Sequence, residues 1–585
     1  MLFEGLPEQE KQRFDRSSKH PLHLGTLSTM LTHLETLIRD VVRSAYQTAF
    51  GAEPPSSFLE IRPADRPEFG DYTSNVAMLA ASDLKTSPRD IGSKLLQVVS
   101  EQIEGDSSHT ILKAELAGPG FLNLFLKPEA VQRSLTRVFD TAKPFGTSQL
   151  GEGKTIQVEF VSSNPTGPLT VGHGRQAVLG DVLATLYERI GYDVHREYYF
   201  NDEGRQVDLL AESLWVRYQE RYEELRDIPE DGYQGEYLIA VAAELGEELD
   251  RSFPVFDEET KQLFRREAVV RMTKLIKDDL VEMGIQFDSW FSETSLHQSG
   301  KIDAALQLLK DRDGVYEEEG ALWLKAEEHG GAKNSVLIRS DGRPTYLMVD
   351  IAYHIDKHKR GFDRVLDVQG ADHHAEQTCV KAALRLLGYP DEWLSYAVHQ
   401  FVSLKEGGQV QKMSTRAGRF VTLHDLTSDL GKDVVRYFMI SRKPEAHLDF
   451  DLDLARAESS DNPSTYIQYA YTRIRSIFRK INSDGITDLD QTDLSLLTET
   501  EELALIKALD QFPQVIAHAA LDFAPHALAE YGLNLSRAFH AYYDKHRVLI
   551  DDVALQTARL ALLSALQIAL RECLAILGMD APEEM

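Results

Sequence analysis

Residues 158–180 read V-E-F-V-S-S-N-P-T-G-P-L-T-V-G-H-G-R-Q-A-V-L-G, and this stretch decides the fold class. Its apolar start predicts a buried strand, the Pro and Gly residues predict a loop, and a helix is expected from G-H-G onward. This order is typical of a phosphate-binding site in a doubly wound parallel sheet. Gly172 and Gly174 let backbone N–H groups approach a phosphate, and His173 adds a donor beside them.

A second segment of the same character lies far downstream. Residues 412–418 read K-M-S-T-R-A-G, in which Lys412, Ser414 and Arg416 suit phosphate oxygens. Lys412 could instead be an ordinary solvated lysine, but its neighbours make that interpretation the less favoured one. Two separated loops of this kind predict one nucleotide held from both sides.

Residues 170–173, T-V-G-H, are similar to the His-Ile-Gly-His signature of class I aminoacyl-tRNA synthetases, and residues 412–415 are similar to their Lys-Met-Ser-Lys loop. The longer string N-P-T-G-P-L-T-V-G-H-G-R resembles the arginyl-tRNA synthetase version specifically. Two positions depart from the family pattern, because Thr170 replaces the first His and Thr415 the last Lys. Thr170 still offers an uncharged donor, whereas a neighbouring cation would have to supply the charge that Thr415 lacks.

The resemblance implies where catalysis and ATP binding occur. The catalytic residues that it indicates are Thr170, His173, Lys412, Ser414 and Arg416. The ATP-binding residues that it indicates are Gly172, His173, Gly370, Asp372, His373, Lys412 and Met413. The segment Q-G-A-D-H-H (369–374) follows a hydrophobic strand at its carboxyl end, where open α/β sheets bind ligands. Adjacent His373 and His374 could instead hold a metal, but without a nearby Cys or a spaced third His we expect no metal site.

Arginine as a substrate sets a chemical requirement. A guanidinium has five donors and no acceptor, so its pocket must present carboxylates and carbonyls. Pro344 and Thr345 predict a helix start, which places Tyr346 and Asp350 on one helix face. The resemblance implies that arginine is bound by Glu159, Asn164, Tyr346, Asp350 and Asn123, the last from the N-terminal domain. Glu159 could instead be a strand residue satisfied by backbone amides, and Asn123 only a turn residue.

Residues 462–480 read N-P-S-T-Y-I-Q-Y-A-Y-T-R-I-R-S-I-F-R-K and mix tyrosines with arginines. Aromatic side chains that stack on bases, together with cations for phosphates, are typical of proteins that bind RNA loops. The resemblance implies that Tyr469, Arg473 and Met585 contact the anticodon region of tRNA. A helical stripe of tyrosines is more often part of a core, so we expect only one of the three tyrosines to touch RNA.

The composition limits the class of protein. A chain of 585 residues is too long for one core, so several domains are expected. Cys379 and Cys573 are the only cysteines, which argues against a disulfide framework and a thiolate zinc site. No long apolar run predicts a membrane span, and the start M-L-F-E-G-L-P-E-Q-E-K is too acidic for a secretory signal. A cytoplasmic protein is expected.

The net charge is the observation that argues against RNA binding. The chain has 63 basic and 93 acidic residues, a net charge of −30, whereas nucleic-acid binders are usually basic. The alternative is an acidic enzyme that acts on small molecules. Because exposed charges are screened beyond about 10 Å, the local potential matters more, and we predict basic patches on an acidic surface.

The patterns predict a multidomain α/β protein with three domains. Residues 1–150 are expected to form an α+β domain that docks on tRNA, because residues 68–77 and 118–126 resemble the N-terminal domain of the same family. Residues 151–455 are expected to form the Rossmann-like catalytic domain with a helical insertion at about 205–344. Residues 456–585 are expected to form an α-helical bundle similar to the family's anticodon-binding domain.

The resemblance implies an ATP-dependent ligase that forms arginyl-adenylate and then transfers arginine to the terminal adenosine of tRNA(Arg). The expected partners are L-arginine, tRNA(Arg) and ATP with Mg²⁺, and the expected state is a monomer away from membranes. One alternative is a nucleotidyltransferase unrelated to tRNA, which would have no use for the aromatic and basic helix. The other is a catalytically silent paralogue, supported only by Thr170 and Thr415.

Overall fold

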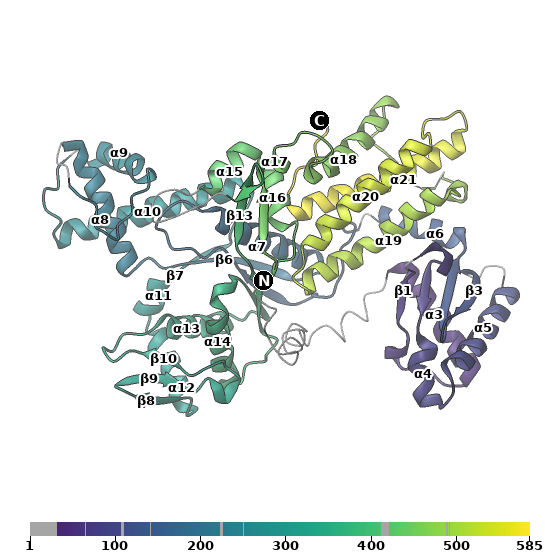
Figure 1. The fold of residues 1–585 in the computed structure, drawn as a ribbon, viewed down its shortest axis with the longest axis horizontal. Helices are drawn as coiled ribbons and strands as arrows, with labels where there is room; N and C mark the ends of the chain where they lie inside the picture. The colour runs from purple at the N-terminus through teal and green to yellow at the C-terminus, as the bar shows by residue number, and fades with distance from the viewer. Residues whose placement is uncertain are drawn as a thin grey trace.

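The computed structural model describes residues 32–64, 66–106, 110–140, 142–222, 226–249, 251–410, 421–486, 489–490 and 492–585. Four predicted site residues lie outside the described residues: Lys412, Met413, Ser414 and Arg416. Figure 1 shows an N-terminal domain at one end of the molecule and a helical arm at the other, with a parallel sheet and a helical bundle between them.

A five-stranded parallel sheet occupies the centre, in the order β12-β11-β5-β6-β7. Its strands are β5 (Thr155–Glu159), β6 (Asp193–Phe200), β7 (Ser289–Ser292), β11 (Arg364–Gly370) and β12 (Leu394–His399). One face packs on α7 (Val171–Arg189), and the other packs on α13 (Tyr346–Lys359) and α14 (His374–Leu386). Covered faces explain why residues 156–159 are buried without alternation. The predicted doubly wound fold is confirmed.

The chain between β6 and β7 forms a helical arm with its own core. Its helices are α8 (Arg205–Gln219), α9 (Tyr237–Leu249) and α10 (Glu258–Glu282), which pack around Leu214, Tyr218 and Phe264. After β7 come α11 (Glu293–Gln298), α12 (Lys301–Asp311) and an antiparallel sheet of β8 (Val315–Glu318), β9 (Ala321–Leu324) and β10 (Ser335–Ile338). The range expected to be a helical insertion therefore also contains strands, because short runs such as A-L-W-L favour a sheet.

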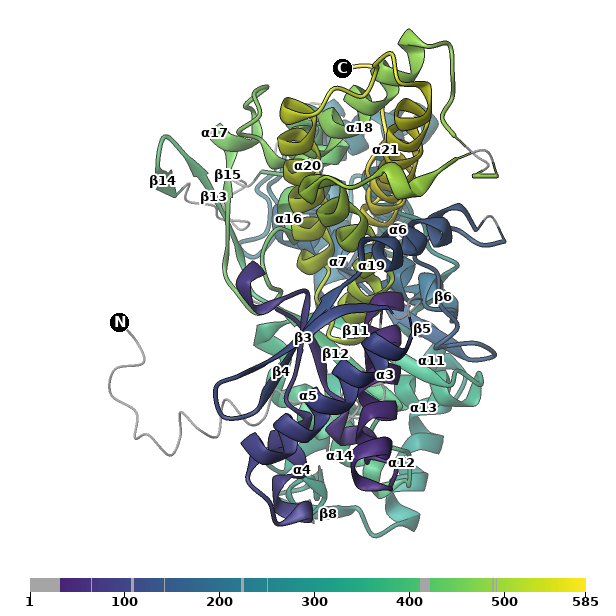
Figure 2. The same cartoon turned by 90° about the vertical axis from the view of Figure 1, so that its right-hand side faces the viewer.

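The N-terminal domain combines a four-stranded antiparallel sheet with three helices. The sheet order is β1 (Ile61–Pro63), β2 (Tyr72–Ser74), β4 (Phe121–Leu126), β3 (Ile111–Ala117). The helices are α3 (His33–Phe50), α4 (Val76–Leu84) and α5 (Pro88–Gly105). The linking helix α6 (Pro128–Ser134) packs on α19 (Thr500–Leu521), which joins this domain to the C-terminal bundle (Figure 2).

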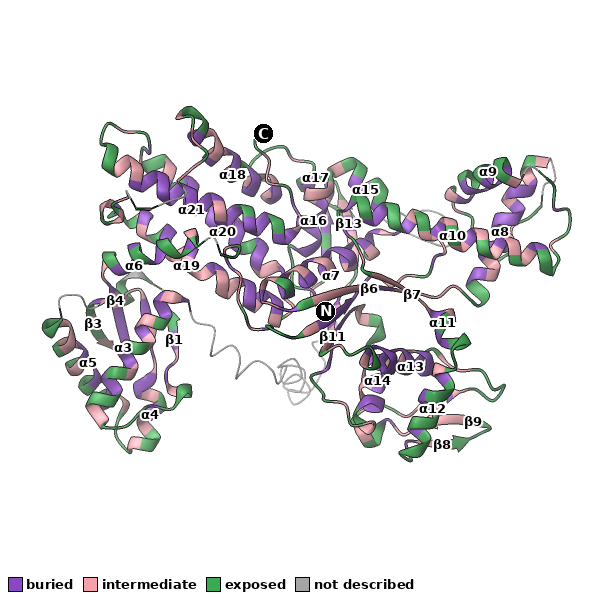
Figure 3. Cartoon of the chain, turned by 180° about the vertical axis from the view of Figure 1, so that it is seen from behind, coloured by how far each residue is buried: buried purple, intermediate pink, exposed green. Residues whose placement is uncertain are grey.

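The C-terminal region is a bundle of α18 (Pro463–Lys480), α19, α20 (His526–Lys545) and α21 (Val553–Leu577). α21 is long and apolar enough to span a membrane, but 83% of its most apolar window is buried inside the protein, so it is the core helix of the bundle (Figure 3). Between the sheet and the bundle lie β13 (Val402–Glu406), β14 (Gln409–Val410), α15 (Leu423–Leu430), α16 (Lys432–Ile440), β15 (Leu448–Asp451) and α17 (Leu452–Ala455).

Candidate active site

Thr170 and His173 together form the start of α7. Thr170 is the N-cap residue, and its backbone N–H lies 3.2 Å from Nδ1 of His173 as a donor. Because Nδ1 accepts this hydrogen bond, the proton of the neutral ring is on Nε2. Burial, with a smaller contribution from His399, lowers the pKa of His173 to about 4. At neutral pH the histidine is therefore an uncharged donor.

The chain that follows residues 411–420 lies against the start of α7. Thr422 pairs with Thr170 in an isolated antiparallel bridge, and the N–H of Leu423 donates to the carbonyl of Leu169 at 2.7 Å. A Cβ on Gly174 would lie 2.7 Å from Cδ1 of Leu423, whereas one on Gly172 would meet nothing closer than 3.7 Å. Gly174 therefore permits helix packing, and only Gly172 faces open space.

The carboxyl end of β11 carries the predicted adenosine-binding residues. A Cβ on Gly370 would lie 2.5 Å from Oδ1 of Asp372, so the exposed carboxylate of Asp372 turns back toward the strand end. His373 is exposed and lies 3.6 Å from Glu376 and 3.7 Å from Asp372. Hydrogen bonding to Glu376 raises the pKa of His373. The structure thus brings these residues to the edge of the sheet where α7 begins.

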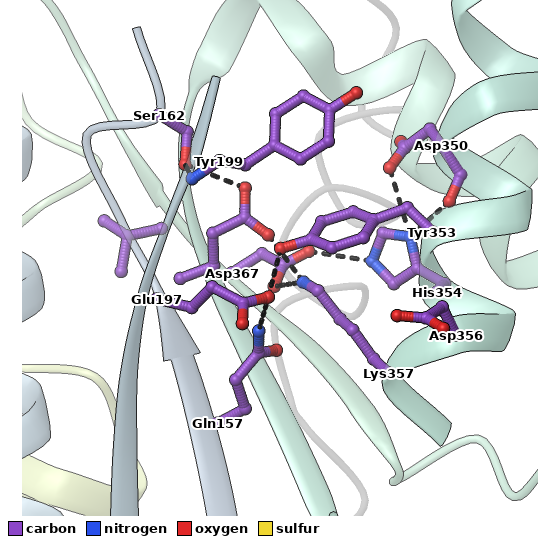
Figure 4. Close-up of polar contacts among 12 residues, drawn as sticks. Gln157, Ser162, Glu197, Tyr199, Asp350, Tyr353, His354, Asp356, Lys357 and Asp367 are labelled. Carbon is purple, nitrogen blue, oxygen red and sulfur yellow. Dashed lines mark hydrogen bonds and ion pairs between the residues drawn. The ribbon is translucent and has the colours of Figure 1, made fainter. Parts of the chain in front are cut away.

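α13 begins where the sequence predicts. Thr345 is its N-cap, and Oγ1 of Thr345 accepts from the N–H of Met348 at 3.4 Å. The side chain of Tyr346 is largely exposed, at 69%, and Asp350 is partly buried one turn further on. Nδ1 of His354 lies 3.1 Å from Oδ1 of Asp350, which holds this carboxylate against the helix (Figure 4).

Glu159 is buried at the end of β5, and its partners are side chains rather than backbone amides. Nζ of Lys357 lies 2.6 Å from its Oε2, and Oγ of Ser162 donates to its Oε1 at 2.9 Å. Burial raises the pKa of Glu159, and the ammonium of Lys357 acts in the opposite direction. The next turn is strained, since Val161 and Ser162 have φ angles of 69° and 43°. This strained turn points Ser162 toward the carboxylate.

The two predicted asparagines lie in different surroundings. Asn164 is exposed in the loop after β5, and its Nδ2 donates to Oε1 of Gln206 at 2.8 Å, at the start of the helical arm. Asn123 lies inside β4 opposite Thr73 and Glu115, with only 4% of its surface exposed. It is thus a strand residue rather than a turn residue. Its register partners belong to the N-terminal sheet, and its contact with arginine stays a prediction.

Several ionisable residues of the site were not predicted from the sequence. They are Lys357, His354, Asp367, Glu197 and Glu293, all buried. Glu293 accepts from the hydroxyl of Tyr199 at 2.6 Å and from Nδ2 of Asn201 at 2.9 Å, and burial raises its pKa. The signal that could have revealed the residues of α13 is the spacing of the charged residues in D-I-A-Y-H-I-D-K (350–357). Charged residues at this spacing are unusual on the buried face of a helix.

Arg175, directly after the G-H-G, is also almost completely buried. Its guanidinium donates to the carbonyls of Gln400 at 2.6 Å, Ala446 at 3.0 Å and Lys443 at 3.0 Å. These bonds join α7 to the end of β12 and to the chain before β15. Arg175 therefore has a structural function that the spacing in the sequence did not indicate.

The aromatic residues of α18 divide into two groups. Tyr471 is buried in the bundle, whereas Tyr466 and Tyr469 line a cavity of about 900 Å³ that Met585 also lines. Tyr469 is 46% exposed and stacks on His540, with ring centroids 5.5 Å apart. The cavity lies between α18 and the segment α15–α17, so two predicted RNA contacts, Tyr469 and Met585, lie side by side.

The arginines of α18 also differ from one another. The guanidinium carbon of Arg473 lies 4.5 Å from the ring centroid of Tyr543 and 5.9 Å from that of Tyr469, which lines the cavity. Arg475 instead pairs with Glu583 at 2.8 Å, and Arg479 pairs with Glu584 at 3.0 Å. Residues 580–585 thus lie along α18 and occupy two of the cations that had been expected to face RNA.

The parallel sheet and the helix start formed by Thr170 and His173 are those of a class I aminoacyl-tRNA synthetase, and residues 136–444 match the description "tRNA synthetases class I (R), catalytic domain". Residues 32–126 match "Arginyl tRNA synthetase N terminal domain", and residues 467–585 match "DALR anticodon binding domain". The chain belongs to the arginyl-tRNA synthetase family.

Full-length relatives support this assignment. The arginine–tRNA ligase of Thermotoga maritima is 42% identical over 555 residues, which cover 94% of this chain and 100% of that protein. The arginine–tRNA ligase of Shouchella clausii is 41% identical over 555 residues, covering 94% and 99%. The solved arginyl-tRNA synthetase of Thermus thermophilus has a TM-score of 0.73 at 25% identity, covering 94% of this chain and 100% of that one. The resemblance found in the sequence is confirmed.

Proposed function

We propose that this chain attaches L-arginine to its cognate tRNA, first forming arginyl-adenylate from ATP and then transferring arginine to the terminal adenosine. The observation that carries the residue assignment is that two kinds of group meet at one edge of the sheet. A neutral donor, His173, lies at the start of α7, and two carboxylates, Glu159 and Asp350, lie beside β5. Donors suit phosphate oxygens, whereas carboxylates suit a cationic amino acid.

In the first step the carboxylate of arginine attacks the α-phosphorus of ATP, and pyrophosphate leaves. Charge develops on the phosphate oxygens, so positioned donors lower the barrier more than bond-making side chains do. Nε2–H of His173 and the amides after Gly172 would donate from one side. Lys412, Ser414 and Arg416 would act from the other, and Mg²⁺ would enter with the phosphates of ATP. Gly370, Asp372 and His373 would receive the adenosine.

Arginine would lie between β5 and α13. Asp350 and Tyr346 would face the guanidinium. Glu293 is a further carboxylate nearby, because it accepts from the hydroxyl of Tyr199, whose ring packs on Tyr353 of α13. Glu159 and Asn164 would bind the α-ammonium and carboxylate end. Each hydrogen bond between charged groups would contribute roughly 1.5–3 kcal/mol, and lysine would leave part of the acceptor set unpaired.

The tRNA would reach the protein at more than one place. Tyr469, Arg473 and Met585 would contact the anticodon region at the cavity beside α18, while the terminal adenosine enters the sheet site. We propose that the enzyme acts as a cytoplasmic monomer.

The decisive test is ATP–pyrophosphate exchange measured with arginine, with and without tRNA(Arg). We expect pyrophosphate exchange only when arginine is present. When tRNA(Arg) is added, we expect arginyl-tRNA to form. Exchange that any amino acid supports would favour an unrelated nucleotidyltransferase, and no exchange under either condition would favour a silent paralogue.

A further inference from the structure

The side chains of five residues form an unbroken chain of alternating charge behind the proposed arginine pocket. In order they are Asp350, His354, Asp367, Lys357 and Glu159. The distances between successive partners are 3.1, 2.8, 2.7 and 2.6 Å. The two carboxylates at the ends are the ones assigned to arginine, while the three residues between them are almost completely buried. Figure 4 shows Asp350, His354, Asp367 and Lys357 together.

The sheet itself creates the need for Lys357. Asp367 in β11 pairs in register with Glu159 in β5, so two carboxylates stand side by side on neighbouring strands. Both are more than nine-tenths buried, and two adjacent carboxylates repel each other when both are ionised. Nζ of Lys357 lies 2.7 Å from one and 2.6 Å from the other. A single ammonium therefore bridges the two carboxylates and offsets their mutual repulsion.

His354 makes the corresponding link at the other end. Its Nε2 lies 2.8 Å from Oδ2 of Asp367. Its Nδ1 lies 2.8 Å from the backbone carbonyl of Asp350 and 3.1 Å from Oδ1 of the same residue. Burial alone would lower the pKa of His354, but the carboxylates of Asp350 and Asp367 outweigh this and raise it to about 10. The ring is thus protonated at neutral pH and donates in both directions.

The helix supplies the geometry of the chain. Asp350, His354 and Lys357 follow one another at spacings of four and three residues on α13, so all three face the sheet. Asp367 contacts both cations of the helix, and at 1% exposure it cannot touch a bound amino acid. Its influence on arginine can act only through its neighbours.

We propose that Asp367, with His354 and Lys357, is a positioning residue that couples the two ends of the arginine pocket. The inference rests on the proposed function, because it takes Asp350 as the guanidinium acceptor and Glu159 as the ammonium acceptor. Asp367 fixes the two cations, and each cation fixes one of these carboxylates. The distance between the two acceptor carboxylates is therefore fixed inside the protein before arginine binds. This favours a ligand whose two cationic groups are separated by a matching length of chain.

The test is a double-mutant cycle between Asp367→Asn and Asp350→Asn. Asp367→Asn should raise the KM for arginine by about tenfold or more and leave the KM for ATP within about twofold. In the Asp350→Asn background the same change should have a much smaller effect on arginine, because the acceptor that it positions is already lost. Arginine should also protect the Asp367→Asn variant less against thermal unfolding than it protects the parent.

Two controls separate positioning from general damage. Glu502→Gln removes a buried carboxylate that pairs with Arg559 at 2.8 Å in the C-terminal bundle, so it should lower stability without raising the KM for arginine. His358→Gln lies on the same helix as His354, but its ring stacks on Tyr389 at 4.1 Å, and it should leave arginine binding unchanged. If Asp367→Asn fails to fold, His354→Gln takes its place in the cycle.

The outcomes distinguish the two proposals. If Asp350→Asn leaves the KM for arginine unchanged, the pocket assignment itself is wrong. If Asp350→Asn raises that KM but Asp367→Asn and His354→Gln do not, the pocket stands and the coupling is overturned. Fully additive effects of the two substitutions on arginine would also overturn it.

Discussion

The backbone N–H of Thr170 donates to Nδ1 of His173 across 3.2 Å, so the residue that caps α7 also fixes the tautomer of the histidine. The donor is a main-chain group, which any residue other than proline provides. This explains how a threonine can stand where the family signature has its first histidine. The change replaces an imidazole by a hydroxyl but keeps the backbone hydrogen bond that orients His173.

His173→Ala should lower kcat while leaving the KM for ATP nearly unchanged. A preorganised donor that acts on the transition state contributes about 2.7–4 kcal/mol to its stabilisation. Single-turnover adenylate formation would measure the loss directly. His447→Ala, an exposed histidine that contacts Ser403 and Asp449, is the control and should retain the parent rate. A His173 variant with the parent rate would show that this loop is only structural.

Gly172→Ala and Gly174→Ala should separate phosphate binding from packing. A Cβ on Gly174 would lie 2.7 Å from Leu423, and overpacking of this kind costs about 1–3 kcal/mol, so Tm should fall. A Cβ on Gly172 meets no atom closer than 3.7 Å, so its Tm should stay the same while adenylate formation slows. Equal thermal stability of the two variants, measured by calorimetry, would contradict the packing argument.

Arg473→Ala and Tyr469→Ala should weaken tRNA binding and spare arginine and ATP. Loss of one stacked base costs about 1–3 kcal/mol, and removal of a cation reduces the salt dependence of binding. Filter binding at several salt concentrations would measure both effects. Arg537→Ala, an exposed arginine on α20 next to Asn534, is the matched control. A tRNA affinity that does not change with salt would argue against the assignment of this helix.

Asp279→Asn should stabilise the protein in a pH-dependent way. Oδ2 of Asp279 accepts from the N–H of Leu169 at 3.1 Å, and burial raises the pKa of this carboxyl from 3.8 to about 6. Below the lower value both states are protonated, and between the two values only the unfolded state ionises, so folding loses stability as the pH rises. Asparagine keeps an acceptor without a charge. The difference in Tm should therefore be small near pH 4, grow toward pH 6 and stay constant above it.

The sequence predicted the elements whose signals are local. The strand and helix around residues 158–180, the helix start at Thr345 and the C-terminal bundle follow from periodicity and capping residues. The pairing of Glu159 with Lys357 did not follow, because Lys357 is 198 residues away and only the tertiary fold brings the two together. The pairing of Arg475 with Glu583 was missed for the same reason, at a separation of 108 residues.

The family pattern placed Asn123 near arginine, but the register of β4 buries it in the N-terminal sheet. Gly174 shows the converse limit. The sequence suggested that Gly174 lets the backbone approach a phosphate. In the structure the side chain nearest to a Cβ at this position is that of Leu423, 249 residues later in the chain. The sequence motifs predict the region of the site, and the tertiary contacts show which residues of a motif are held by packing.

The course of residues 580–585 along α18 has a practical consequence for work on this enzyme. Gln468 and Thr472 donate to the carbonyls of Asp580 and Pro582, and Met585 lines the cavity beside Tyr469. A purification tag or fluorescent fusion added after Met585 would begin beside that cavity, next to Tyr469. Weaker tRNA binding by such a preparation would lower charging at low tRNA, so a defect of the label could be mistaken for a property of the enzyme.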